Sequence, residues 1–145
     1  MKKIFLLASF VVAMSLNLFA QNDTVYYISF KESMGSWSID DKVKPEAVST
    51  IWQQTAQYGM KASAFVGGVK HVTESWFMSA PLDLTSCTSL KMEFNQALNY
   101  ATPDYVSVKI TKDGVNWEKL NVPTMPEGKN WTFVRSGEMD ITPYI

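Results

Sequence analysis

An all-β fold is predicted by two features of this sequence. Short segments alternate between apolar and polar residues, and turn-forming residues separate those segments at short intervals. No segment shows the apolar spacing of three and four residues that an amphipathic helix requires. Many short strands divided by turns are typical of two packed sheets, so the expected architecture is a jelly-roll-like antiparallel β-sandwich. The turn signals lie at Gly35, Gly59, Gly67-Gly68, Pro81, Pro103-Asp104, Asp113-Gly114, Pro123, Pro126 to Gly128 and Ser136-Gly137.

Seven segments illustrate the predicted strands, in chain order. They are "VYYISF" (25–30), "SWSID" (36–40), "GMKASAF" (59–65), "ESWFMS" (74–79), "LKMEFNQA" (90–97), "VSVKIT" (106–111) and "NWTFVR" (130–135). In 106–111 the alternation predicts that Val106, Val108 and Ile110 face inward. In 90–97 it predicts the same for Leu90, Met92 and Phe94. Pro81 has no N–H to donate to a ladder, so the strand of "ESWFMSAPLDL" should end before it.

The first 20 residues have the pattern of a secretory signal peptide. Lys2 and Lys3 precede an apolar stretch, which ends at the small residue Ala20. Removal of 1–20 would leave 21–145 as a single β-sandwich domain. The protein is therefore expected to be exported to the periplasm, the cell surface or the medium, with no membrane insertion after cleavage.

The charge of the remaining chain argues against two classes of partner. Of 13 basic and 14 acidic residues, 1–20 holds two lysines and no acid, which leaves 11 against 14 and a net charge of about −3. Nucleic-acid binding needs a basic patch that displaces counterions, so nucleic acid is not an expected partner. Capture by an anionic membrane surface is disfavoured for the same reason.

No catalytic motif is present, and the chain is predicted not to be an enzyme. Cys87 is the single cysteine and His71 the single histidine, so neither a disulfide nor a site with several histidine or thiolate metal ligands can form within one chain. A hydrolase is the less favoured alternative, because glycoside hydrolysis normally uses two carboxylates flanking the bond, and the acids here are scattered singly. The "TKDGVNW" segment around Asp113 is similar to an Asp-box turn and is interpreted as a structural hairpin.

The order of the motifs resembles the choice-of-anchor J family, which is similar to MAM domains and to the cleaved-adhesin modules of secreted bacterial proteins. The segments that carry the resemblance run from "FKESMGSW" through "YGMKASAFVGG" and "LKMEFNQALNY" to "SGEMDITPYI", over nearly the whole of 21–145. The family's strand pattern "WLISPAIDL" is matched by Trp76, Phe77, Met78, Ser79, Pro81, Asp83 and Leu84. The resemblance implies a jelly roll whose last strands, expected after "DITPY", are missing from this sequence.

The resemblance also implies a structural Ca²⁺ ion, since jelly rolls of this kind often hold one with carboxylates and main-chain carbonyls. Oxygen ligands of this type suit a hard cation. By their positions in the motifs, Glu32 and Glu74 are the expected calcium ligands, and the alternative is that both are solvated charges at strand ends.

The aromatic content, with 5 Trp and 6 Tyr, suggests carbohydrate stacking. Trp76, Trp117 and Trp131 fall at positions that favour core or hairpin packing. The candidate ligand residues instead lie near loops, where sandwiches usually present their contacts: Trp52, Tyr58, Asn99, Tyr100 and Tyr105.

The sequence therefore predicts a non-catalytic binding or adhesion module, with a glycan as the first candidate ligand. The alternative is a structural module that binds a surface protein within a larger assembly, for example by adding a strand at an open sheet edge.

Overall fold

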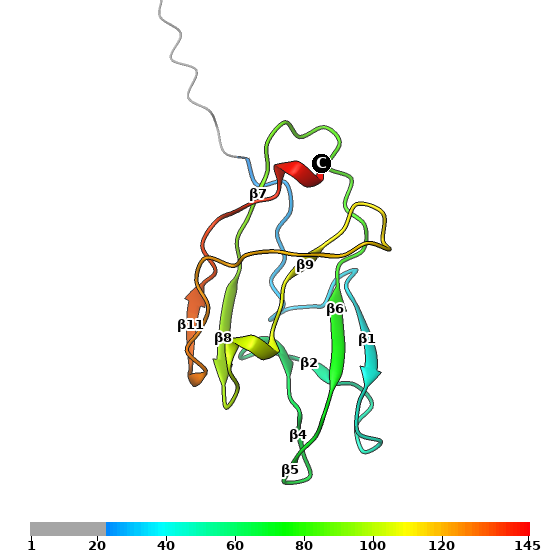
Figure 1. Cartoon of the computed structure of the whole chain (residues 1–145), viewed down its shortest axis with the longest axis vertical. Helices are drawn as coiled ribbons and strands as arrows, with labels where there is room; N and C mark the ends of the chain where they lie inside the picture. The colour runs from blue at the N-terminus through cyan, green and yellow to red at the C-terminus, as the bar shows by residue number, and fades with distance from the viewer. Residues whose placement is uncertain (1–22) are drawn as a thin grey trace, which may run out of the picture. The chain divides into compact units, whose positions relative to one another are not determined.

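The structure is a computed structural model that describes residues 23–145, and strands account for nearly all of its regular structure (Figure 1). Within this range the helical segments are two 3₁₀ turns, η1 (Pro103–Tyr105) and η2 (Thr142–Tyr144). Every strand pair is antiparallel, so the all-β prediction is confirmed. The predicted signal peptide lies outside the described residues. No helix within the described range is long and apolar enough to cross a membrane.

The chain divides into two compact units, with the boundary between Met78 and Ser79. Each unit builds its own small two-stranded sheets. The jelly-roll sandwich and the single domain over 21–145 therefore stay predictions. The boundary follows the strand of "ESWFMS" directly, and that strand ends before Pro81, as the missing N–H of proline requires.

The first unit contains six strands in three antiparallel pairs. They are β1 (Ser38–Val43) with β6 (Glu74–Met78), β2 (Trp52–Thr55) with β3 (Gly59–Ala62), and β4 (Phe65–Val66) with β5 (Val69–Lys70). Four aromatic rings pack together in this unit. Phe77 stands at the centre, with ring centroids 5.1 Å from Phe30, 4.7 Å from Trp37 and 5.4 Å from Trp52. Tilted and edge-on pairs at these distances are favourable for aromatic quadrupoles.

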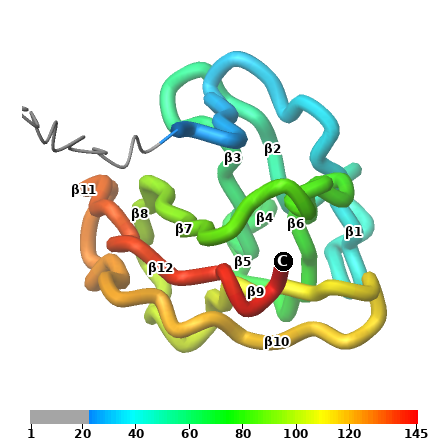
Figure 2. The backbone as a smooth tube through the Cα atoms, turned by 90° about the horizontal axis from the view of Figure 1, so that it is seen from above, coloured from blue at the N-terminus to red at the C-terminus, as the bar shows by residue number. Residues whose placement is uncertain are grey.

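The second unit also contains three antiparallel pairs. They are β7 (Lys91–Met92) with β12 (Met139–Asp140), β8 (Asn95–Asn99) with β11 (Lys129–Arg135), and β9 (Lys109–Ile110) with β10 (Glu118–Lys119). Figure 2 shows β8 and β11 side by side. The core of the second unit is formed by three buried residues, Leu120, Met139 and Ile141. Seven partly buried residues pack against them: Leu90, Met92, Phe94, Val108, Ile110, Val122 and Tyr144. The predicted inward faces of 90–97 and 106–111 are thus confirmed at five of six positions, while Val106 is 38% exposed.

Five of the seven predicted strands differ from the structure: 36–40 is shifted to β1, 59–65 divides into β3 and β4, and the other three differ as follows. Residues 25–30 form no strand, and Val25 and Tyr27 are exposed by 53% and 79%. The Tyr26 hydroxyl accepts a hydrogen bond from Trp37 Nε1 at 3.0 Å, so a side chain rather than a ladder fixes this segment. The 106–111 strand shrinks to β9, and the 90–97 strand divides into β7 and β8.

The division of 90–97 has a local cause in Ser136, which is fully buried. Its hydroxyl accepts from the Phe94 N–H at 3.0 Å, and its N–H donates to the Phe94 carbonyl at 2.9 Å. The backbone N–H and C=O of Phe94 therefore bond to the side chain and main chain of one residue, Ser136, and the regular pairing of 90–97 is interrupted there, where β7 ends and β8 begins.

Candidate ligand-binding sites

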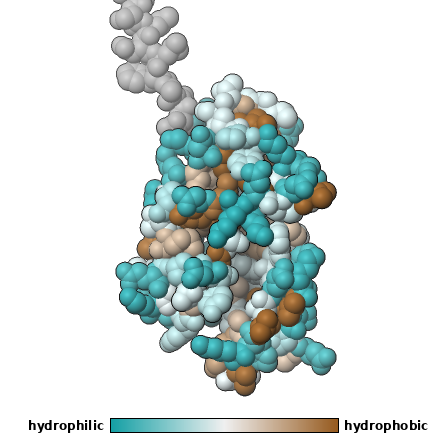
Figure 3. Space-filling model, in the orientation of Figure 1, coloured by the Kyte–Doolittle hydropathy of each residue, from teal (hydrophilic) through white to brown (hydrophobic). Residues whose placement is uncertain are grey.

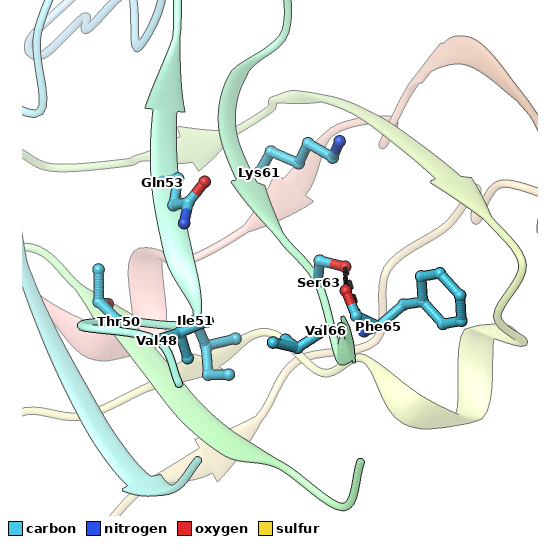
Figure 4. Close-up of a pocket in the computed structure, with 8 residues that line it drawn as sticks. All are labelled: Val48, Thr50, Ile51, Gln53, Lys61, Ser63, Phe65 and Val66. Carbon is cyan, nitrogen blue, oxygen red and sulfur yellow. Dashed lines mark hydrogen bonds between the residues drawn. The ribbon is translucent and has the colours of Figure 1, made fainter. Parts of the chain in front are cut away.

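One face of the β2–β3 hairpin in the first unit carries a pocket of about 280 Å³. Gln53 and Lys61 are direct cross-strand partners, and the Ser63 N–H donates to the Ile51 carbonyl at 3.4 Å, one step further along the pair. Because side chains on opposed residues share a face, these four side chains lie together. Figure 4 shows Ile51 and Val66 pointing toward each other within this pocket.

The loop before β2 is held in place by the Asp41 carboxylate, which lies at the end of the regular β1–β6 register. Its oxygens accept from the Ile51 N–H at 3.2 and 3.4 Å, and from the Ser75 hydroxyl. The Thr50 hydroxyl is also close enough to affect this carboxylate, although it has no partner at full hydrogen-bond geometry among the described residues. Val48 and Thr50, which line the pocket, are thereby fixed relative to β1.

The pKa of Asp41 reflects this environment. Burial acts to raise it, but the hydrogen bond from Ser75, the nearby Thr50 hydroxyl, the bond from the Ile51 N–H and the charge of Lys44 outweigh burial and lower the pKa below its ordinary 3.8. Lys44 also donates to the Val48 carbonyl at 2.7 Å. The pocket loop therefore rests on an ionised carboxylate at neutral pH.

Trp52 lies on the opposite face of β2 from the pocket. Its ring packs against Phe77, and its Nε1 is buried with no hydrogen-bond partner in the described range. Tyr58 lies in the β2–β3 turn, where its N–H donates to the Thr55 hydroxyl at 3.1 Å. Both candidate ligand residues of the first unit are half-buried rather than presented on an open platform.

The other three candidate ligand residues come together in the second unit, in the loop that follows β8. Tyr100 and Tyr105 are exposed by 85% and 83%, among the highest values of the large apolar and aromatic side chains described. Tyr105 ends η1, in which its N–H donates to the Thr102 carbonyl at 3.2 Å. Pro103 restricts the start of that turn, because its ring fixes φ. The backbone of the loop is therefore ordered while both rings face solvent.

Tyr100 has a left-handed backbone, with φ of +59°, which non-glycine residues adopt at a cost. The Asn99 side-chain oxygen accepts from the Tyr100 N–H at 3.1 Å, so this oxygen supports the loop. On the neighbouring turn, Gly128 approaches so closely that a Cβ would collide with the Ala101 carbonyl oxygen. The close contact between Gly128, where only glycine fits, and Ala101 therefore holds the loop in its strained conformation.

The predicted calcium ligands lie in the first unit, and both side chains are exposed. The Glu74 carboxylate accepts from Trp76 Nε1 at 3.2 Å. In residues 23–145, no three side chains of Asp, Glu, His or Cys gather as a metal-binding group. Neither Glu32 nor Glu74 therefore belongs to such a group, and calcium binding stays a prediction from the resemblance.

The Asp113 carboxylate accepts several hydrogen bonds from groups of its own turn. It accepts from the N–H groups of Val115 and Asn116 at 2.8 and 2.7 Å, and from the Thr111 hydroxyl at 2.9 Å. The backbone bond from Asn116, followed by the side-chain bond from Asn116 and the bond from Val115, holds the pKa of Asp113 far below its usual 3.8. The interpretation as a hairpin turn is consistent with these contacts.

Comparison with known proteins gives no assignment: no family model, no curated protein and no solved structure matches the chain. The resemblance to choice-of-anchor J modules therefore stays a prediction.

The pocket residues Gln53, Lys61, Ser63 and Phe65 were not among the predicted ligand residues. Their signal in the sequence is the alternation of "IWQQ" and "MKASAF", which places the neighbours of Trp52, rather than Trp52 itself, on the pocket face. The pairing of the two strands decides which face is hollow, and that pairing is not readable from either segment alone.

Proposed function

We propose that this protein is an exported, non-catalytic binding module that binds a glycan through Tyr100 and Tyr105. The observation that carries the proposal is that these two rings are 85% and 83% exposed on a loop whose backbone is ordered. A loop backbone that is ordered before binding costs little conformational entropy when a sugar face covers its exposed rings. The resemblance to adhesion modules, stated above, agrees with this function.

The pocket of the first unit offers no support for the hydrolase alternative, because no carboxylate lines it. Two carboxylates flanking a bond are what that chemistry normally uses.

The proposal is tested by screening the purified protein on an array of immobilised glycans and measuring affinity for each binder by calorimetry. Tyr105→Ala and Tyr100→Asn should each weaken binding about tenfold, or about 1.4 kcal/mol, as expected for a lost stacked ring. Asn is chosen at position 100 because it tolerates the left-handed backbone, so the ring is removed without adding strain.

Tyr27→Ala is the matched control, since Tyr27 is 79% exposed but belongs to the first unit. It should leave glycan affinity unchanged. Absence of glycan binding, or binding that survives loss of both loop tyrosines, would contradict the proposal.

A protein partner is the second candidate, and one observation favours it. Around the β4–β5 hairpin, Val69 and Val72 are exposed by 57% and 87%. Figure 3 shows hydrophobic residues at the surface at the end of the view where Figure 1 labels β4 and β5. Exposed apolar groups of this kind often mark protein-interaction sites. Retention on immobilised surface proteins, without any glycan binding, would favour this function.

A further inference from the structure

The pocket of the first unit is closed on one side by a second hairpin, β4–β5. The Ser63 hydroxyl joins the two hairpins at their corner: it accepts from the Phe65 N–H at 3.2 Å and donates to the Phe65 carbonyl at 3.3 Å. The β4–β5 turn is Gly67-Gly68, with φ of +60° and +83°, as a tight two-residue hairpin turn requires. β4 is thus held beside the β2–β3 face, and Figure 4 shows its Val66 side chain turned toward Ile51 and its Phe65 ring turned away from Ile51.

The lining of this pocket is divided between two kinds of chemistry. Val48, Ile51, Phe65 and Val66 supply an apolar part, and Phe65 is nevertheless 60% exposed. Gln53, Lys61, Ser63 and Thr50 supply a polar part in which Lys61 carries the one charge among the lining residues. The apolar side chains of Ile51 and Val66 beside a cation and neutral hydrogen-bonding groups suit a molecule with an apolar body and an anionic head.

The size of the pocket restricts that molecule further. At about 280 Å³ the pocket lies just below the roughly 300 to 1,000 Å³ of typical ligand pockets, so its ligand must be small. We infer that this pocket binds a small carboxylate with a hydrocarbon body, its carboxylate at Lys61 and its apolar part against Ile51 and Val66. The inference concerns the first unit and does not depend on glycan binding by the second.

The experiment is a titration of the ¹⁵N-labelled protein with 3-phenylpropionate, followed by amide chemical shifts. Saturable shifts at millimolar concentrations should concentrate in the pocket strands, at Gln53, Lys61, Ser63, Phe65 and Val66. The neutral isostere 3-phenylpropionamide should bind at least several-fold more weakly, because it lacks the charge that Lys61 would meet. No saturable shifts, shifts centred elsewhere, or equal binding of acid and amide would overturn the inference.

Substitutions of Lys61 test the position of the carboxylate. Lys61→Gln should weaken 3-phenylpropionate binding roughly tenfold while leaving the amide isostere unaffected, and Lys61→Arg should retain most of the affinity. Lys70→Gln is the control, since Lys70 is an exposed lysine on β5 that does not line the pocket. Equal losses for Lys61→Gln and Lys70→Gln would show a general charge effect and overturn the site.

If Lys61→Gln proves unfolded, the comparison of acid and amide on the unchanged protein decides the question alone. Failure of this inference is distinguishable from failure of the glycan proposal, because neither loop tyrosine is altered in these measurements.

Discussion

At the scale of single residues, the two faces of β6 have different roles. Ser75 and Phe77 share one face: Ser75 bonds Asp41, and Phe77 packs among Phe30, Trp37 and Trp52. Trp76 points to the other face, where its Nε1 donates to Glu74. The sequence motif suggested Trp76 as the core residue of this strand, but its neighbour Phe77 holds the central place in the aromatic cluster. Aromatic type alone does not distinguish the two, since alternation shows only that they face opposite ways.

This difference predicts unequal costs of truncation. Phe77→Ala should lower the free energy of unfolding by about 3 kcal/mol, because it removes the ring that the other three contact. Trp76→Ala should cost less than Phe77→Ala, because Trp76 lies on the opposite face of β6 from the four-ring cluster. Urea unfolding of the two variants measures both values. A larger loss for Trp76→Ala than for Phe77→Ala would show that the motif tryptophan, and not Phe77, stabilises the unit.

At the scale of elements, the sequence predicted strands where both alternation and a partner exist. β6 and β11 lie within a residue of their predicted ranges, because their partners β1 and β8 supply a ladder. Residues 25–30 have similar β propensity but no ladder, and β9 keeps two residues of the predicted six. A strand is defined by its pairing as much as by its own residues, and pairing depends on segments far away in the sequence.

The turn between β9 and β10 gives a prediction about pH. The pKa of Asp113 is lowered by hydrogen bonds from Asn116 and Val115, so these bonds stabilise the turn fully above pH 3.8 and are lost as pH falls through the lowered pKa. An NMR titration of the Asp113 carboxyl carbon should therefore have its midpoint clearly below 3.8. A midpoint at or above that value would mean that the carboxylate is not held by the turn.

The variant Asp113→Ala is the control for this assignment. It should remove the low titration and accelerate hydrogen exchange of the Val115 and Asn116 amides, whose acceptor is lost. Exchange that is unchanged in the variant would show that other contacts hold the turn.

At the scale of the whole molecule, the sequence predicted the all-β class. It also predicted the exposed loop residues of the second unit better than the candidate ligand residues of the first unit. The sequence predicts Tyr100 and Tyr105 as ligand residues because "NYATPDY" lies near a loop, and loops expose their side chains; both rings are exposed in the structure. The same argument predicts Trp52, but Trp52 lies within a hairpin, where its ring packs against Phe77. The pocket beside it depends on how two hairpins meet through Ser63 and Phe65, which no single segment encodes.

The proposed function depends on export of the protein, which can be tested directly. We expect cleavage after Ala20, because the small residue there follows the apolar stretch that a signal peptidase substrate needs. Expression of the full sequence in an exporting bacterial cell should therefore give a protein that begins at Gln21, as read by intact mass. Ala20→Tyr places a bulky ring at the cleavage position and should leave the leader attached. A product that stays inside the cell with Met1 to Ala20 intact would contradict export, and with it a role in binding surface glycans.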